Sequence, residues 1–532
     1  MLSLSKPDKH FLNKQKQQPQ NVNINLILKK INKISGSRGA LLAGCGAEPH
    51  GFKVLAHNSH QKKFLLTHLK NICYNTKLSV PIIIFKEAFM STEKNGIIKD
   101  SFAQLGVPKT LLLGLQHMFA MFGATVLVPL ISGLSVQVTL IGVGVGTLIF
   151  HFLAKGRVPA FLGSSFAFLV GIQAITDPVY GIYAGSGMSQ AEKLQYAGGA
   201  IFVVSFVYLL MAAVIKLVGV QKVMKFIPPV VTGPVVVLIG IMLAPFAINQ
   251  SATNPLLAVV AFVVVLIASV WGRGMLKVIP LFLGVVIAYF IALLLHGVGF
   301  TNLDGGAIFN FAQVAESPPV GLPNFTIARF DIIAIIIMLP FALATMVEHI
   351  GDMVVLSTIC EEDFIEDKPG LPRTLMGDGL ATCFSAFFGG PATTTYGENT
   401  GVIALTKIQD ARVLMLAACY AIVLAFSPIF AALIYSIPAA IIGGVSFILY
   451  GMIAAVGLRT MVEAKINFNH NRNLIIVAVT FVTGLGLNFG NPISFNIGDI
   501  SIPLDSLGLA LATVLGILLN AILPKEESAE NK

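Results

Sequence analysis

Residues 391–407 read Pro-Ala-Thr-Thr-Thr-Tyr-Gly-Glu-Asn-Thr-Gly-Val-Ile-Ala-Leu-Thr-Lys. The stretch is apolar enough to lie in a membrane, yet its proline, its run of threonines and its two glycines disfavour a continuous helix. It also carries one acid, Glu398. Irregular backbone at membrane depth persists where protein or a water-filled cavity satisfies its polar groups. The stretch therefore predicts a broken helix beside an internal cavity.

A second acid, Glu348, lies in another apolar segment, within Met346–Asp352. An ionisable residue inside a membrane-spanning segment is by default a candidate for a functional site, because its burial is costly. Two buried carboxylates beside an interrupted helix predict a solute-binding transporter. The alternative is that each glutamate simply pairs with a neighbouring helix.

The composition is that of a polytopic helical membrane protein. Hydrophobic residues make up 55% of the 532 residues and charged residues 11%, with a mean hydropathy of +0.82. Soluble domains carry roughly 25% charged residues. Apolar runs of about 20 residues recur along the chain, as membrane-spanning helices require. The alternation of apolar and polar residues typical of an outer-membrane barrel is missing from the sequence.

Positive charge is concentrated in residues 1–100, which hold 16 Lys and Arg against 5 Asp and Glu. We expect a basic, disordered extension there. Three interpretations stay open: a cytoplasmic tail on anionic lipid, an organellar presequence, or translation that starts at Met90. We favour the third. We expect no nucleic-acid binding, because no aromatic residues interleave with these charges.

From residue 107 onward, apolar segments recur at a spacing typical of membrane-spanning helices. The third and tenth are short and polar, so we expect half-helices preceded by short extended strands there. The predicted fold class is an all-α polytopic membrane protein. The fourteen predicted segments are 107–130, 136–154, 158–176, 195–217, 226–247, 255–272, 276–297, 330–356, 372–389, 392–406, 411–427, 436–457, 472–486 and 503–523.

The basic residues test this count of segments. If the N-terminus is cytoplasmic, seventeen Lys and Arg residues at loops and segment ends lie inside, whereas Lys193 and Arg329 lie outside. One segment miscounted early would scramble this positive-inside bias. We therefore expect a multi-pass protein of the cytoplasmic membrane with both termini in the cytoplasm, the last as a tail at 525–532.

A faint internal repeat joins two halves of the chain. Pro159-Ala160 recurs 232 residues later as Pro391-Ala392. A Gln-His pair in the first segment is matched, at the same offset, by Glu-His in the eighth. Seven segments in each half give the halves opposite topology. The repeat predicts a 7+7 inverted arrangement, with halves at 101–329 and 330–524 and a site at the midplane where broken helices meet.

A set of motifs is shared with one known group of membrane transporters. The string Glu398-Asn399-Thr400-Gly401, followed by Thr406-Lys407, resembles the signature of the nucleobase–ascorbate transporter family. The other matching stretches resemble its uracil permease branch, and the resemblance covers about residues 105–525. These stretches are Leu115–His117, Phe119–Thr125, Pro159–Phe166, Glu348–Gly351 and Thr395–Asn399.

The resemblance implies a core (segments 1–4 and 8–11), a gate (segments 5–7 and 12–14) and a homodimer. It implies that Glu348 and Glu398 hydrogen-bond the base, and that backbone N–H groups near Phe166 and Gly397 meet its carbonyls. Glutamate at the head of the signature is typical of uracil transporters, and glutamine of purine transporters. The further positions that the resemblance places along the pocket are Ala124, Tyr396 and Tyr450.

The chemistry of uracil agrees with these residues. Its two ring N–H groups can donate to carboxylates, and its two carbonyls can accept from the amides at half-helix N-termini. A glutamate that gains or sheds a proton between the two faces can couple transport to a proton gradient. We predict uracil import by proton symport and alternating access, with Glu348 as the proton carrier and Glu398 mainly as a ligand.

One position departs from the uracil permease pattern, which often has histidine one helical turn after Glu348, where this sequence has Asp352. Three roles for Asp352 stay open: a second proton site, binding of the base through water, or pairing with a neighbouring helix. Aspartate can donate a hydrogen bond only when it is protonated.

His349 shares the spacing of a metal site with two nearby acids, but no second cluster completes a coordination shell. We expect no metal or other cofactor, and we assign His349 and Asn399 structural roles beside the site. The chief rival function is import of xanthine or another purine. An anion transporter of similar fold would need a positive pocket, and an enzyme would need a metal triad or a nucleophile–base pair, which the predicted segments lack.

Overall fold

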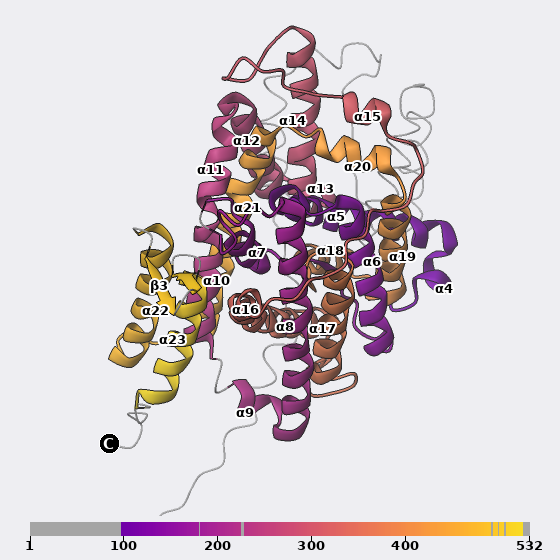
Figure 1. The fold of residues 1–532 in the computed structure, drawn as a ribbon. Coiled ribbons are helices and arrows are strands. Elements are labelled where there is room, and N and C mark those ends of the chain that lie inside the picture. Colours follow the sequence, from indigo (N-terminus) through magenta and orange to yellow (C-terminus); the bar gives the residue numbers. More distant parts are fainter. Residues whose placement is uncertain are drawn as a thin grey trace, which may run out of the picture. The chain divides into compact units, whose positions relative to one another are not determined.

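The computed structural model describes residues 97–524, apart from residues 180, 225–227, 491–492, 498–499 and 505–506. The expectations for residues 1–96 of the basic extension, including its start at Met90, and for the tail at 525–532 lie outside the described residues. The structure is mostly helical (Figure 1).

Within residues 391–407, the chain folds as a short strand followed by a half-length helix, and one earlier part of the chain does the same. β1 (Leu162–Ser164) leads into α7 (Ala167–Thr176), and β2 (Thr393–Thr395) leads into α18 (Gly397–Thr406). The two strands pair antiparallel, so the two half-helices leave from opposite ends of one short ribbon. The structure thus has strands where the sequence predicts extended chain, in segments 3 and 10.

A buried threonine holds each strand in place. Thr147, in α6 (Val136–Leu153), accepts from the N–H of Leu162 at 3.0 Å and donates to its carbonyl at 3.2 Å. Thr382, in α17 (Leu371–Phe387), does the same for Thr393, at 3.0 and 3.1 Å. These hydroxyls satisfy backbone groups that no helix satisfies at this depth.

Eight helices surround the ribbon or carry it. α8 packs against α16 and α17, α19 packs against α5 and α6, and α6 packs against α17. Figure 1 shows α8 and α17 side by side. This set consists of α6, α7, α17 and α18, whose bounds are given above, together with α5 (Val107–Ser132), α8 (Gln190–Val218), α16 (Ile332–Cys360) and α19 (Ala411–Ala425).

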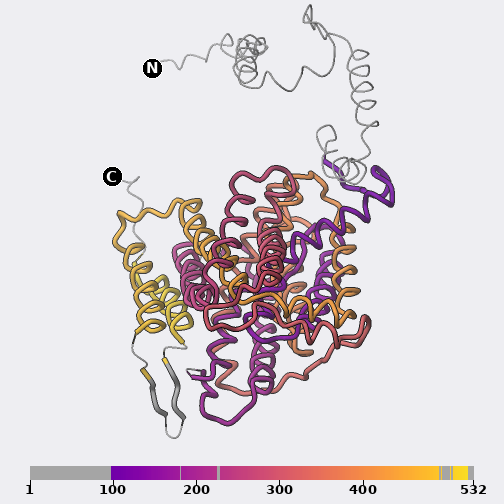
Figure 2. Tube along the Cα trace, turned by 90° about the horizontal axis from the view of Figure 1, so that it is seen from above, coloured from indigo at the N-terminus to yellow at the C-terminus, as the bar shows by residue number. Residues whose placement is uncertain are grey.

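A second set of helices packs mainly among itself. α21 contacts α10, α11 and α12, α14 contacts α12, and α22 pairs with α23. In the view of Figure 2, α22 and α23 (yellow) lie together at one side, and both contact α10. This set consists of α10 (Pro229–Met242), α11 (Ala244–Ala252), α12 (Pro255–Trp271), α14 (Pro280–Gly297), α21 (Ala439–Glu463), α22 (Asn471–Phe489) and α23 (Gly508–Ile522).

Short elements complete the described chain. The sequence did not predict the hairpin of β3 and β4, and α23 starts at Gly508 rather than at the predicted residue 503. The short elements are α4 (Ser101–Leu105), α9 (Val220–Met224), α13 (Met275–Val278), α15 (Ala312–Glu316), α20 (Pro428–Tyr435), β3 (Ser494–Ile497) and β4 (Ile500–Pro503).

Eight helical stretches are long and apolar enough to cross a membrane among the residues that the structure describes. A ninth is present if α19 and α20 count as one stretch, although the chain bends by 88° between them. Several predicted segments correspond to shorter helices, such as α7, α12 and α23. The chain is therefore a multi-pass helical membrane protein, and the count of fourteen segments stays a prediction.

The threonines beside the ribbon generate a stability prediction. We expect Thr382→Val and Thr147→Val each to lower the free energy of unfolding by about 1–3 kcal/mol, because each leaves a buried backbone N–H without its acceptor. Thermal unfolding of the purified protein in detergent measures the loss. Thr460→Val in α21 is the control, since its hydroxyl donates to the carbonyl of Val456 at an exposed position. A loss of equal size in the control would contradict the prediction.

Candidate functional site

The start of α18 faces open space. Gly397 is its first residue and is exposed, and a Cβ built on Gly397 would meet no atom within 4 Å. The same is true of a Cβ on Gly401, one turn later. Tyr396, the residue before this helix, supplies no side-chain cap, so the first amide groups are available to a ligand, apart from the amide of Glu398, which its own carboxyl group engages. Because those amides carry partial positive charge, the site favours an acceptor oxygen.

The carboxyl group of Glu398 lies next to these amides. Glu398 is the second residue of α18 and is half-buried. Phe166, which stands 232 residues before Glu398, is the residue directly before α7, and it is also half-buried. α7 likewise has no side-chain cap. Each half-helix thus presents uncapped amides beside a residue that the sequence analysis had selected.

Glu348 projects from α16 into accessible space. It is exposed, although α16 is one of the eight apolar helices long enough to span a membrane. A Cβ on Gly351, one turn later, would also meet open space. Within the described chain, neither Glu348 nor Glu398 has a side-chain hydrogen bond or ion pair to another residue. Both carboxylates are therefore free to accept hydrogen bonds from a ligand.

The acids of α16, α17 and α18 form one electrostatic group. Glu348 interacts electrostatically with Asp352, Asp378 and Glu398. Asp352 is half-buried, and its Oδ2 accepts a hydrogen bond of 2.5 Å from the hydroxyl of Thr395, the last residue of β2. This contact with the ribbon is none of the three roles left open for Asp352, and those roles stay predictions.

Tyr396 turns away from the open space. Its side chain is 5% exposed, and its hydroxyl donates to the carbonyl of Ser164 at 3.0 Å. The ring lies so close to Gly163 that any Cβ there would clash with it. The side chain of Tyr396 thus ties β2 to β1. The other two residues expected along the pocket, Ala124 and Tyr450, are also buried, at 1% and 2% exposure.

Asn399 joins α18 to α5. Its side-chain amide donates to the carbonyl of His117 at 3.0 Å and lies 3.1 Å from Nδ1 of the same histidine. Asn399 and His117 are 0% and 1% exposed. This buried contact fixes the rotation of α18 about its axis, and with it the direction in which the adjacent Glu398 points.

The sequence analysis missed Asp378, which pairs with His349. The Nδ1 atom of His349 and the Oδ2 atom of Asp378 lie 3.1 Å apart, and both side chains are 0% exposed. The pair joins α16 to α17 directly behind Glu348. A signal was present in the sequence, because Asp378 is an acid between two glycines in the ninth predicted segment. Among the described residues, no three His, Cys, Asp or Glu side chains are placed to hold a metal ion.

Comparison with known proteins agrees with this architecture. Residues 108–493 match the Permease family, Xan_ur_permease. The uracil permease of Bacillus caldolyticus is 39% identical over 435 residues, which cover 79% of this chain and 93% of that protein. The uracil permease of Bacillus subtilis (strain 168) is 39% identical over 437 residues, which cover 78% and 93%.

Two solved structures share the fold at low sequence identity. The transmembrane domain of the cyanobacterial bicarbonate transporter BicA has a TM-score of 0.51 and 16% identity, and the match covers 80% of this chain and all of that domain. The murine anion transporter Slc26a9, in its inward-facing state, has a TM-score of 0.56 and 13% identity, with 82% and 74% covered. These likenesses concern the fold alone.

The buried pair behind the site generates the second prediction. We expect Asp378→Ala to lower the free energy of unfolding by about 1–3 kcal/mol, because it leaves His349 buried without its partner. Glu463→Ala is the matched control, since Glu463 pairs with Arg459 on the exposed surface of α21, and exposed pairs contribute about 0–1 kcal/mol. Thermal unfolding in detergent compares the two. Equal losses would show that the buried pair has no special role.

Proposed function

This chain belongs to the Permease family and is a multi-pass membrane transporter rather than an enzyme, and on that premise we propose that it imports uracil across the cytoplasmic membrane by proton symport. The observation that carries the proposal is the pair Glu348 and Glu398, both accessible and both without a side-chain partner among the described residues. They lie beside the uncapped amides of a half-helix.

The geometry suits a flat base that has both donors and acceptors. The ring N–H groups of uracil would donate to the carboxylates of Glu348 and Glu398. Its carbonyls would accept from the amides at Gly397 and near Phe166. Leaving one of these buried groups unpaired costs about 1–3 kcal/mol, so analogues that lack an N–H group should be rejected. The relatives named as uracil permeases support this choice of base.

Protons are the coupling ion in this proposal. Glu348, Asp352 and Glu398 lie within electrostatic reach of one another, and a group of acids so placed is suited to taking up a proton on one side of the membrane and releasing it on the other. Glu348 is the assigned carrier, because Asp352 is already engaged by Thr395. Asp352 is a second candidate.

The architecture proposed for transport has fourteen segments in a 7+7 inverted repeat. Its support is the matched packing around the ribbon: α19 lies against α5 and α6, just as α8 lies against α16 and α17. The two threonines that hold β1 and β2 are related in the same way. The set around the ribbon would be the moving core, and the set around α21 would be the gate.

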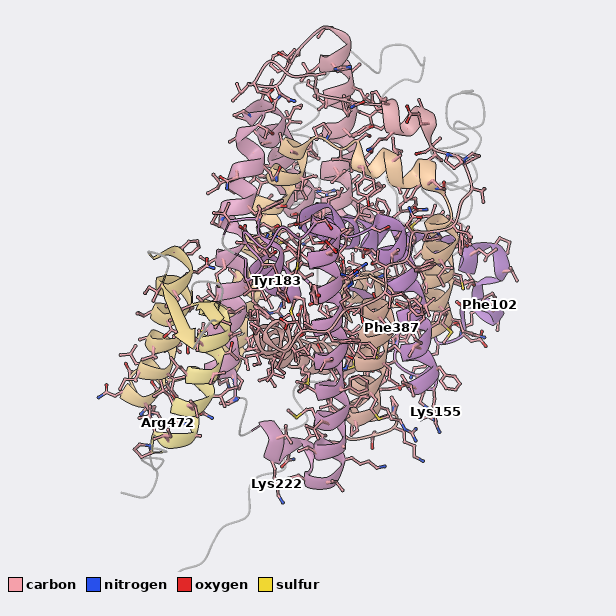
Figure 3. All side chains as sticks on the ribbon, viewed as in Figure 1. Phe102, Lys155, Tyr183, Lys222, Phe387 and Arg472 are labelled. Carbon is pink, nitrogen blue, oxygen red and sulfur yellow. The ribbon has the colours of Figure 1, made fainter. Side chains whose placement is uncertain are left out.

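A cytoplasmic location of both termini and a homodimer complete the proposal. Lys155, Lys222 and Arg472 are among the seventeen basic residues that the charge bias assigns to the inside, and all three lie in the lower half of the view in Figure 3. Their common side supports the orientation. The homodimer rests on the family resemblance.

The runner-up is import of xanthine or another purine, and the rival of another class is an anion transporter. The two solved structures of similar fold are a bicarbonate transporter and an anion transporter. The charged side chains that the structure brings to this site are acidic, however, and acids repel an anion. Uptake of a panel of bases into proteoliposomes under imposed proton and sodium gradients separates these functions. Uracil uptake that resists excess unlabelled uracil but stops with xanthine would favour the purine.

The two glutamates give the third prediction. We expect Glu398→Gln to abolish high-affinity uracil binding, because the amide replaces one acceptor oxygen by a donor. We expect Glu348→Gln to keep some binding but to remove the dependence of uptake on the pH gradient. Glu463→Gln on the exposed surface of α21 should change neither. Normal accumulation of uracil by both site variants would place the site elsewhere.

The open space at Gly397 gives the fourth prediction. A Cβ at residue 397 would meet no protein atom within 4 Å, so a valine side chain there would enter the open volume beside Glu398. We expect Gly397→Val to weaken uracil binding at least about tenfold, or ~1.4 kcal/mol, and to change the free energy of unfolding by less than about 1 kcal/mol. Gly163→Ala is the contrasting variant, because its Cβ would clash with the ring of Tyr396 and destabilise the fold. Unchanged binding in Gly397→Val would contradict the assignment.

A further inference from the structure

The segment Ile97–Leu105, which precedes the first long helix, is bonded to the turn that follows α18. Ile98 forms a parallel β-bridge with Ile408. The N–H of Ile98 donates to the carbonyl of Lys407 at 3.0 Å, and the N–H of Gln409 donates to the carbonyl of Ile98 at 2.8 Å. Ile98 is 4% exposed and packs in a small apolar cluster with Ile408. The contact is thus a strand-like seam with a packed side chain.

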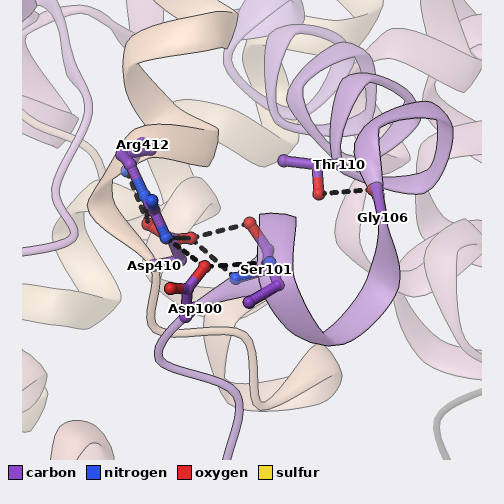
Figure 4. A network of polar contacts seen from close by, with 7 residues as sticks. Asp100, Ser101, Gly106, Thr110, Asp410 and Arg412 are labelled. Atoms are coloured by element: carbon purple, nitrogen blue, oxygen red, sulfur yellow. Dashed lines mark hydrogen bonds and ion pairs between the residues drawn. The ribbon is translucent and has the colours of Figure 1, made fainter.

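A buried carboxylate strengthens this seam (Figure 4). Oδ2 of Asp410 accepts from both the N–H and the hydroxyl of Ser101, at 2.8 and 2.7 Å. Ser101 and Asp410 are 0% and 4% exposed. Arg412 donates to both oxygens of Asp410, at 2.9 and 2.8 Å, and to Asp100 at 2.5 Å. Asp410 is therefore the centre of the network.

The charges of the network persist over the physiological pH range. Burial opposes ionisation of Asp410, but the bonds from Arg412 and Ser101 outweigh it and hold the pKa of its carboxyl below the ordinary value. The pKa of Asp100 is also lowered, first by the amide of Ala103 and then by Arg412. An acid whose pKa is lowered by folding loses its contribution only as the pH falls through that lowered value. The seam therefore stays intact from neutral pH down to about 4.

The same turn is bonded to the end of α16. The side-chain amide of Gln409 donates to the carbonyl of Ile359 at 3.0 Å. Lys99, in the preceding segment, pairs with Glu362, just beyond that helix. The chain around Gln409 is thus held by the segment Ile97–Leu105 and by the end of α16, and it leads directly into α19.

This attachment acts on the helix that carries Glu398. α18 has ten residues and is about 15 Å long, so a tilt of about 10° about one end moves the other end by about 2–3 Å. Part of its surface faces open space, at Gly397 and Gly401, where no neighbouring side chain restrains it. Its direction therefore depends on how its ends are held.

The other half-helix is held differently. α7 is followed by a turn of its own chain, in which the N–H of Ile182 donates to the carbonyl of Ala174 at 3.0 Å. Tyr183 in that turn donates to Asp331, the residue before α16. Neither contact involves the segment Ile97–Leu105. A defect in the seam should therefore loosen α18 and leave α7 unchanged.

We propose that the segment Ile97–Leu105 is a latch that fixes the direction of α18, and that Asp410 is a positioning residue for the substrate site through this latch. Asp410 itself lies beyond the opposite end of α18 from Glu398 and touches no substrate. The choice of uracil as the probe rests on the proposed function. The latch itself does not.

Two measurements on the full-length Asp410→Ala variant test the latch. Amide hydrogen exchange in nanodiscs should become faster in α18 and in residues 97–105, and stay unchanged in α7, because exchange reports local opening. Equilibrium binding of radiolabelled uracil should weaken by about tenfold or more, since small misplacements of a site carry such losses. Arg459→Ala, which breaks an exposed ion pair in α21, is the control and should change neither.

Two further readouts separate positioning from a general loss of stability. Asp410→Asn keeps an acceptor for Ser101, so it should restore much of the protection of α18 and much of the affinity. The ratio of variant to wild-type affinity should be the same at about pH 6 and about pH 8, because Asp410 is charged throughout that range. Uniformly faster exchange in α7 and α18, or loosened α18 with unchanged affinity, would overturn the proposal. If wild-type protein failed to bind uracil, the proposed function would fail, and the exchange data would still decide the latch.

Discussion

The structure depends on the need to satisfy backbone polar groups at membrane depth. A chain that leaves the helical state in a membrane must find other partners for its N–H and C=O groups, because lipid offers none. Here the two interrupted stretches satisfy each other as the ribbon of β1 and β2. Thr147 and Thr382 supply the remaining bonds on either side. Tyr396 fills the space above Gly163 and bonds to Ser164.

That arrangement creates a candidate binding site as a consequence. Two half-helices that start at a ribbon expose uncapped amides where a continuous helix would have none. A Cβ on Gly397, at the start of α18, or on Gly351, within α16, would meet open space. Glu398 and Glu348 lie within one turn of these glycines and have no side-chain partners in the described part of the chain. The carboxylates of these two glutamates are acceptors, and the amides at the starts of the half-helices are donors. A nucleobase presents the complementary donors and acceptors.

A second layer of buried polar contacts supports the glutamates without facing the open space. Asn399 ties α18 to α5, Asp378 ties α17 to α16, and Thr395 engages Asp352. The latch adds a restraint at the far end of α18. Because each contact joins a different pair of elements, the direction of Glu398 is set by several helices at once. Such over-determination is what keeps a site on a short helix in a defined geometry.

The sequence alone determined the helical membrane class, the two interrupted stretches and the presence of two acids, Glu348 and Glu398, in apolar segments. These features are local: apolar runs, a proline with threonines and glycines, and acids in apolar surroundings. It did not determine that Tyr396 turns inward, that Asp378 pairs with His349, or that the chain bends by 88° between α19 and α20. Nor did it reveal that Ser101 meets Asp410, 309 residues later. Only the tertiary structure decided these points, because such contacts join residues far apart in the chain, and no local pattern records which distant groups packing brings together.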